Sequence, residues 1–149
     1  MTKQATKSAP APEGSAKVRT DIELAFADGV YLFKFGIPQI EEIQKAAGVG
    51  IGAVYANLIR GRYLFGAGPA EPDPIDAEYR HENIVNVIRQ GLIGGGKGVV
   101  DGQEVTVTAY RANQLVENYL LQTPIAERWA LAFAALTAPI QGVPDDRET

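Results

Sequence analysis

The chain reads Ile88-Arg89-Gln90-Gly91-Leu92-Ile93-Gly94-Gly95-Gly96-Lys97-Gly98 near its middle, and the interpretation of the fold turns on this stretch. The segment before the glycines, from about Ala77 to Leu92, carries apolar residues at helical spacing, which predicts a helix with Asp76 as its N-cap. Glycine after the last periodic residue supplies the left-handed conformation that ends a helix. The glycine cluster is therefore expected to terminate a helix.

The same glycines also match part of a nucleotide-binding motif. Gly91, Gly96 and Lys97 fit the G-x-x-x-x-G-K pattern of a phosphate-binding loop, but Gly98 occupies the position where serine or threonine must hold magnesium. Such a loop leaves a strand and opens a helix, so that helix N–H groups face the anion. Here the glycines follow a helix. A nucleotide-binding protein is therefore only a distant alternative, and the chain is expected not to be an enzyme.

Length and composition indicate one domain without disulfide bonds, metal sites or cofactors. The 149 residues suit a single globular domain, expected over residues 18–142, after a disordered basic leader at 1–17 and before a flexible end at 143–149. There is no cysteine, so disulfides, thiolate metal sites and cysteine nucleophiles are excluded. His81 is the one histidine and cannot build a histidine metal site. No cofactor or metal is expected.

Charge and hydropathy restrict the partners. The net charge is −4, and the basic residues of the leader leave the rest of the chain distinctly acidic. Nucleic-acid binding needs clustered lysine and arginine, so an acidic body disfavours it. No apolar run approaches the ~18 residues of a membrane span, and the leader lacks the apolar core of a secretory signal. These features predict no nucleic-acid or membrane partner and a cytoplasmic location.

A β-hairpin is predicted over residues 21–35, around the turn dipeptide Asp28-Gly29. Pairing outward from that turn places large apolar residues on one face and Glu23 opposite Lys34 on the other. The expected apolar cross-strand pairs are Phe26 with Tyr31, Leu24 with Phe33 and Ile22 with Phe35. A second, short hairpin is possible around Asp101-Gly102.

The remaining pattern is helical. Helices are predicted over Gln39 to Ala47, with Gly48 as the stop, and over Gly50 to Ile59. Two more follow, one capped by Thr108 with a stripe from Ala112 to Leu120, and one that starts at Thr123-Pro124 and is lined by Ile125, Trp129, Ala132, Phe133 and Leu136. The fold class is therefore α+β, mostly α, with an N-terminal β-hairpin packed on four or five helices.

None of the polar residues that stand out forms a catalytic group. Glu41 and Glu42 are neighbours on a helix and point about 100° apart, so they do not share a substrate. Arg60 and Arg62 flank Gly61 at an expected helix end, where cations suit the helix dipole. Tyr79, Arg80 and His81 fall in the first turns of the predicted long helix, and Trp129 falls on an apolar stripe. Each of these is interpreted as structural.

Several segments together resemble one family. Besides the Asp28-Gly29 hairpin, they are Glu41-Glu42 followed by Gly48-Val49-Gly50-Ile51-Gly52-Ala53-Val54-Tyr55-Ala56, Ile88 to Gly96, Arg111-Ala112-Asn113-Gln114-Leu115-Val116-Glu117, and Pro124-Ile125-Ala126-Glu127 before an alanine-rich helix. Over about residues 21–142 the chain resembles the tail assembly chaperones of gene transfer agents and related tailed phages, which are sometimes labelled tail tube proteins.

The resemblance implies a role without chemistry. A tail assembly chaperone would coat the tape measure protein in the cytoplasm and help to recruit tail tube protein subunits, and a homo-oligomer is possible. A structural tail tube component is the alternative, although one hairpin is little β-structure for it. The expected partner-binding residues lie where small residues permit close approach, and they are Gly50, Ile51, Val54, Tyr55, Leu92 and Ile93.

Overall fold

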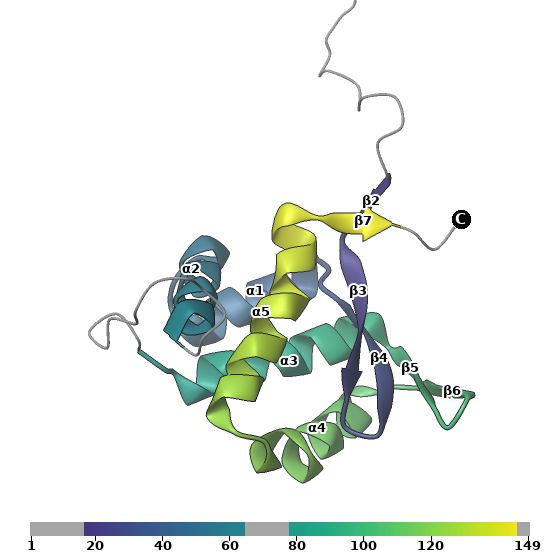
Figure 1. The fold of residues 1–149 in the computed structure, drawn as a ribbon. Helices are drawn as coiled ribbons and strands as arrows, with labels where there is room; N and C mark the ends of the chain where they lie inside the picture. The colour runs from purple at the N-terminus through teal and green to yellow at the C-terminus, as the bar shows by residue number, and fades with distance from the viewer. Residues whose placement is uncertain (1–16, 65–77, 146–149) are drawn as a thin grey trace, which may run out of the picture.

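The computed structural model describes residues 17–64 and 78–145, and its fold is α+β with helix dominating, as predicted. Figure 1 shows the long C-terminal helix at the centre, with helices around it and the sheet along one side. In chain order the elements are β2 (Lys17–Arg19), β3 (Asp21–Phe26), β4 (Gly29–Lys34), α1 (Ile37–Ala47), α2 (Ile51–Leu64), α3 (His81–Gly95), β5 (Lys97–Val100), β6 (Gln103–Thr106), α4 (Ala109–Asn118), the 3₁₀ turn η2 (Leu120–Gln122), α5 (Ile125–Gln141) and β7 (Val143–Asp145).

The predicted hairpin forms, but its register differs from the prediction. Leu24 lies opposite Tyr31 rather than Phe33, because the turn residues are Ala27 and Asp28 instead of Asp28 and Gly29. Ala27 adopts the positive φ of 57° that the turn requires. A shift of two residues keeps every side chain on its predicted face. The apolar face is therefore correct, whereas Glu23 lies opposite Leu32 and not Lys34.

The second hairpin also forms, and it extends the sheet. Strands β5 and β6 flank a turn in which Asp101 and Gly102 both have positive φ, and the sheet order is β3-β4-β5-β6. β5 pairs with the first part of β4, where Val30 faces Val99 and Tyr31 faces Gly98. Figure 1 shows the β5–β6 hairpin projecting from the body on the side opposite α2.

The glycine cluster does more than end a helix. Gly96 is the left-handed residue, with φ of 71°, and its N–H donates to the carbonyl of Leu92 at 2.9 Å. Gly94 and Gly95 are still helical, and a Cβ on either would overlap the carbonyl groups of Lys34 and Leu32. The end of α3 therefore covers the part of β4 that β5 leaves unpaired.

Two predicted helix starts need correction. α3 begins at His81 and not at Ala77, with Arg80 in extended conformation as its N-cap; Ala77 and Asp76 lie outside the described residues. For α5 the N-cap is Pro124, because the hydroxyl of Thr123 donates instead to the carbonyl of Leu120 at 2.7 Å. The predicted start of α4 is confirmed: the Thr108 hydroxyl accepts from the N–H of Arg111 at 3.1 Å.

The core joins the sheet to every helix. Its largest fully buried side chains are Trp129, Tyr31, Phe33, Ile43, Leu58, Ile84, Ile88, Leu92, Leu115, Leu120, Leu136 and Val87. Ile125 was expected on the buried face of α5 but is 43% exposed in the first turn of that helix. Gly61, expected at a helix end, lies inside α2, where the indole of Trp129 fills the space that a side chain would need.

The two ends of the described domain are paired. β2 and β7 form an antiparallel ladder in which Arg19 faces Val143, so residues 143–145 form a strand rather than a flexible end. Arg19 is 8% exposed and binds the carboxylates of Asp21 at 2.7 Å and Glu23 at 2.8 Å. These contacts, chiefly the hydrogen bond to Glu23, raise the pKa of Arg19 above its ordinary value. Residues 1–16 and 146–149 lie outside the described part, including most of the predicted leader.

Candidate binding groove

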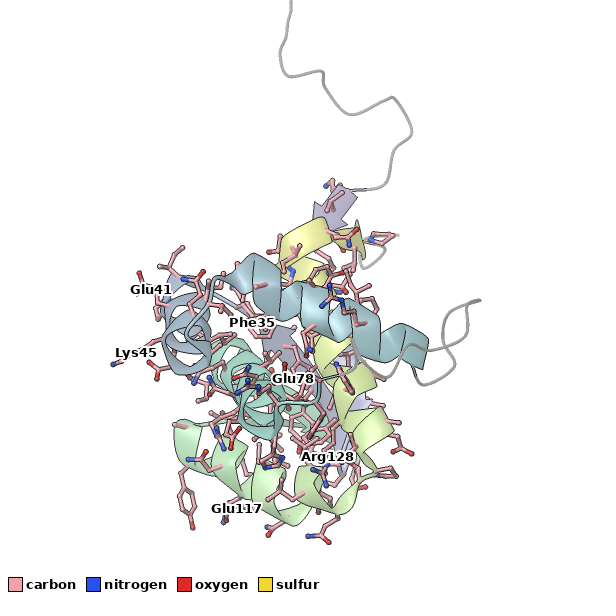
Figure 2. The ribbon with its side chains drawn as sticks, turned by 90° about the vertical axis from the view of Figure 1, so that its left-hand side faces the viewer. Phe35, Glu41, Lys45, Glu78, Glu117 and Arg128 are labelled. Atoms are coloured by element: carbon pink, nitrogen blue, oxygen red, sulfur yellow. The ribbon has the colours of Figure 1, made fainter. Side chains whose placement is uncertain are left out.

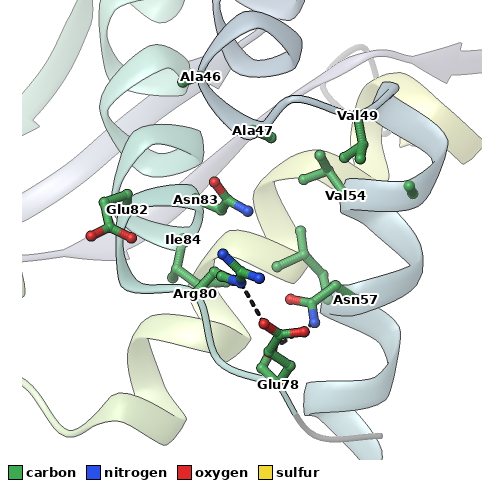
Figure 3. Close-up of a pocket in the computed structure, with 12 residues that line it drawn as sticks. Ala46, Ala47, Val49, Val54, Asn57, Glu78, Arg80, Glu82, Asn83 and Ile84 are labelled. Carbon is green, nitrogen blue, oxygen red and sulfur yellow. Dashed lines mark hydrogen bonds and ion pairs between the residues drawn. The ribbon is translucent and has the colours of Figure 1, made fainter.

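A groove of about 410 Å³ lies where α1, α2 and the start of α3 meet (Figure 3). Alanines line its walls: Ala46 and Ala47 come from the end of α1, and Ala53 comes from α2. Val54, Leu58 and Ile84 are buried side chains that form its apolar floor. Val49, in the α1–α2 joint, is 48% exposed at its edge. Small side chains on the walls leave room for a large apolar side chain from outside.

Polar side chains also line this groove. The guanidinium of Arg80 pairs with the carboxylate of Glu78 at 2.5 Å, and the Asn57 amide donates to the Glu78 carbonyl at 2.7 Å. Figure 3 shows this cluster on one side of the groove, with Asn83 and Glu82 on the start of α3 beside it. The groove therefore combines buried apolar side chains with polar ones, and protein-binding sites also contain both kinds.

The joint that positions the groove follows from its sequence. Gly48 ends α1 with φ of 76°, and the side chain of Gln44 bridges to the next helix by accepting from the N–H of Ile51 at 2.9 Å. On the other side of α2, the indole of Trp129 donates to the Asn57 carbonyl at 3.2 Å. These contacts fix the helices that supply most of the groove, whereas Val49, Glu78 and Arg80 lie outside the helices.

The structure distributes the predicted partner-binding residues between core and surface. Val54, Tyr55 and Leu92 are buried in the core, Ile51 and Ile93 are partly buried against it, and Gly50 is exposed. Of the six, Val54 alone lines the groove.

Tyr55 has a clear packing role. Its ring stacks on Phe133 with the centroids 5.7 Å apart, and its hydroxyl lies 2.8 Å from that of Thr137 and accepts from Gln141 at 2.9 Å. These contacts attach α2 to α5. Tyr55 is therefore occupied inside the fold.

The two predicted segments do not form one surface. α1 and α3 run in opposite directions, because Gln39 near the start of α1 lies beside Gly94, whereas Ala46 and Ala47 lie beside the start of α3. Leu92 and Ile93 are consequently at the far end of α1 from the groove. Sequence reasoning missed Glu78 and Asn57 and interpreted Arg80 as structural, since only the fold brings these residues to the alanines.

The other candidate residues are placed as follows. Lys97 points outward from β5, with its Nζ 4.0 Å from the carboxylate of Glu104. The adjacent α3 offers its C-terminal end, whose carbonyls do not attract phosphate.

Glu41 lies on the outer side of α1, one turn from Lys45, whereas Phe35 lies among the packed helices (Figure 2). Within residues 17–64 and 78–145, no group of three histidine, cysteine or acidic side chains is placed to hold a metal.

Several residues from the segments quoted for the family resemblance make contacts within the fold. Asp28 in the hairpin turn accepts from the hydroxyl of buried Tyr31 at 2.6 Å, and Arg111 on α4 approaches its other oxygen at 3.3 Å. Burial, followed by the bond to Asp28, raises the pKa of Tyr31 to about 12. Arg89 on α3 donates to Asn113 on α4 at 2.7 Å.

Comparisons of the chain with protein-family models, curated proteins and solved structures find no match. In the described part of the chain, no helix has the length and apolar character needed to cross a membrane.

Proposed function

We propose that this protein is a non-enzymatic tail assembly chaperone of a gene transfer agent or prophage-like particle. In this proposal it binds the tape measure protein in the cytoplasm and aids assembly of tail tube subunits. The resemblance of residues 21–142 to that family motivates the proposal. The single structural observation that supports it is the alanine-walled groove between α1, α2 and α3.

The groove suits a helical partner. A helix that exposes large apolar side chains at i, i+3 and i+4 can insert one between Ala47 and Ala53 and reach the buried floor. The Glu78–Arg80 pair and Asn57 offer polar groups to the flanking residues of that helix. Such binding requires no catalytic group.

A pair of tryptophan substitutions tests this role of the groove. Ala53→Trp fills the groove, whereas Ala56→Trp places the same side chain on an exposed position of α2 that does not line it. With the tape measure protein co-expressed, Ala53→Trp is expected to reduce co-purification about tenfold, the effect of losing one central contact. Equal co-purification by both variants would count against the groove as the binding site. Circular dichroism of each variant controls for folding.

The position of the gene separates the chaperone from its alternatives at little cost. A gene located between those for the major tail protein and the tape measure protein supports the chaperone. A gene located away from tail genes would leave the resemblance without support.

A further inference from the structure

The groove between α1, α2 and α3 carries an excess of negative charge. The charged side chains that line it are those of Glu78, Arg80 and Glu82, and its α2 wall contributes none. Arg80 is already paired with Glu78. Glu82 is exposed, and within the described part of the chain its carboxylate makes no hydrogen bond or ion pair. Glu82 therefore leaves one uncompensated negative charge at the groove.

A second acidic side chain extends this charge along α1. Glu42 lies one turn before Ala46 and on the same side of the helix, because residues four apart are neighbours on a helix surface. Glu42 is also exposed, and its carboxylate has no hydrogen bond or ion pair among the described residues. Lys45 is the one base on α1, so the two acids Glu41 and Glu42 leave that helix with a net charge of −1.

Glu82 is placed to meet a residue beside the apolar side chain that enters the groove, which we call the anchor. Figure 3 shows Arg80 and Asn83 directed toward α2, and Glu82 on the outer side of α3. In a bound helix, residues three and four positions from the anchor lie about one turn away on the same side. Lysine and arginine at these positions keep their charge in water while their methylene groups cover apolar surface. Such a side chain can therefore reach Glu82 while the anchor fills the groove.

We propose that the groove selects a basic amphipathic helix, in which a lysine or arginine one turn from the anchor pairs with Glu82. This inference rests on the proposed binding of a partner helix in the groove, and it specifies the charge of that helix. Glu42 attracts a second basic residue where the helix continues past Ala46. An acidic residue next to the anchor brings like charges together at Glu82, so helices with acidic flanks are rejected.

A pair of model peptides tests this charge preference in the absence of the tape measure protein. Each is a helix of about 18 residues with a central leucine, and with either lysine or glutamate three and four residues to each side of it. Fluorescence anisotropy with the full chain is expected to show about fivefold tighter binding of the lysine peptide, and a preference that decreases with added salt. Glu82→Gln should weaken this preference and Glu82→Lys should remove or reverse it.

Two further variants show whether the preference belongs to the groove. Glu117→Lys makes the same change of net charge as Glu82→Lys, but on an exposed position of α4 well apart from Glu78 (Figure 2), and should leave the preference unchanged. Ala53→Trp fills the groove and should abolish binding of both peptides. Circular dichroism of each variant controls for folding.

The outcomes separate this inference from the proposed function. Equal binding of the two peptides, tighter binding of the glutamate peptide, or a preference that Glu82→Lys leaves intact would overturn the inference alone. A lysine peptide that still binds the Ala53→Trp variant would place the attraction outside the groove and would overturn it too. If neither peptide binds, the groove does not receive helices, and both proposals lose their site. The chaperone role itself is tested separately, by co-purification with the tape measure protein.

Discussion

Gly95 at the end of α3 lies directly against the carbonyl group of Leu32 in β4, with no room for a side chain between them. Gly94, the residue before Gly95, lies in the same way against the carbonyl group of Lys34. The two contacts bring the helix backbone onto the edge of the strand at the point where the β4–β5 pairing ends. The glycines that resemble a phosphate loop therefore serve as a close contact between helix and sheet.

This contact predicts a large difference between two glycine-to-alanine substitutions. Gly95→Ala forces a methyl group into the Leu32 carbonyl and is expected to lower the free energy of unfolding by about 1–3 kcal/mol. Gly52→Ala, on the exposed side of α2 with nothing near the new methyl group, is expected to be neutral or to stabilise by up to ~1 kcal/mol. Urea denaturation of both variants measures the difference. Equal stabilities would mean that α3 does not approach β4 this closely.

The raised pKa of Tyr31 predicts a loss of folding stability at alkaline pH. Its pKa is raised from 10.0 to about 12 by burial and by its bond to Asp28, so the folded state retains the phenolic proton more tightly than the unfolded chain. The stabilisation from this group is complete below pH 10 and disappears as the pH rises through about 12. Stability measured against pH for the wild type and Tyr31→Phe should diverge in this window. Identical slopes for the two proteins would contradict the raised pKa.

The sequence predicted those features that local patterns encode. Both hairpins, the stop at Gly48 and the cap at Thr108 follow from turn chemistry and periodicity, and all are present. The register of the first hairpin was wrong because Ala27 adopts a left-handed conformation that alanine rarely takes, so composition favoured the Asp-Gly turn.

The candidate site was less predictable, because it depends on packing between distant segments. Small residues in the α1–α2 joint indicated a place of close approach, and the groove does border that joint. Whether Tyr55 and Leu92 face solvent or core depends on α5 and the sheet, which the local pattern does not contain. Strand β7 was missed since a short segment with Pro144 has no strand signal until it meets β2 from the other end of the domain.

Pairing of the two ends predicts an effect of C-terminal truncation. Ending the chain after Gly142 removes β7 and uncovers Arg19, and it is expected to cost roughly 1–3 kcal/mol, at about 1 kcal/mol for each ladder hydrogen bond. Ending it after Asp145 leaves the ladder intact and should cost little. Chemical denaturation of the two truncated proteins distinguishes these outcomes, and similar midpoints would show that β7 contributes nothing.

The phosphate-loop resemblance leads to a prediction about nucleotides. Because the glycines follow α3 and Lys97 reaches toward Glu104, we expect no magnesium-dependent binding of ATP or GTP. Isothermal titration calorimetry with the full chain tests this expectation. Micromolar binding that Lys97→Ala abolishes would revive the nucleotide-binding alternative.

The central claim is that this chain keeps a tape measure protein soluble and that the basic leader is not needed for this. The most direct measurement is the soluble fraction of the tape measure protein co-expressed with residues 17–149, compared with expression alone. This fragment retains Lys17 because that residue pairs with Asp145 in the β2–β7 ladder. We predict that the tape measure protein becomes soluble and co-purifies with the fragment. A tape measure protein that is equally soluble alone, or a chain that purifies as stable tube-like rings, would contradict the chaperone and favour a structural tail tube component.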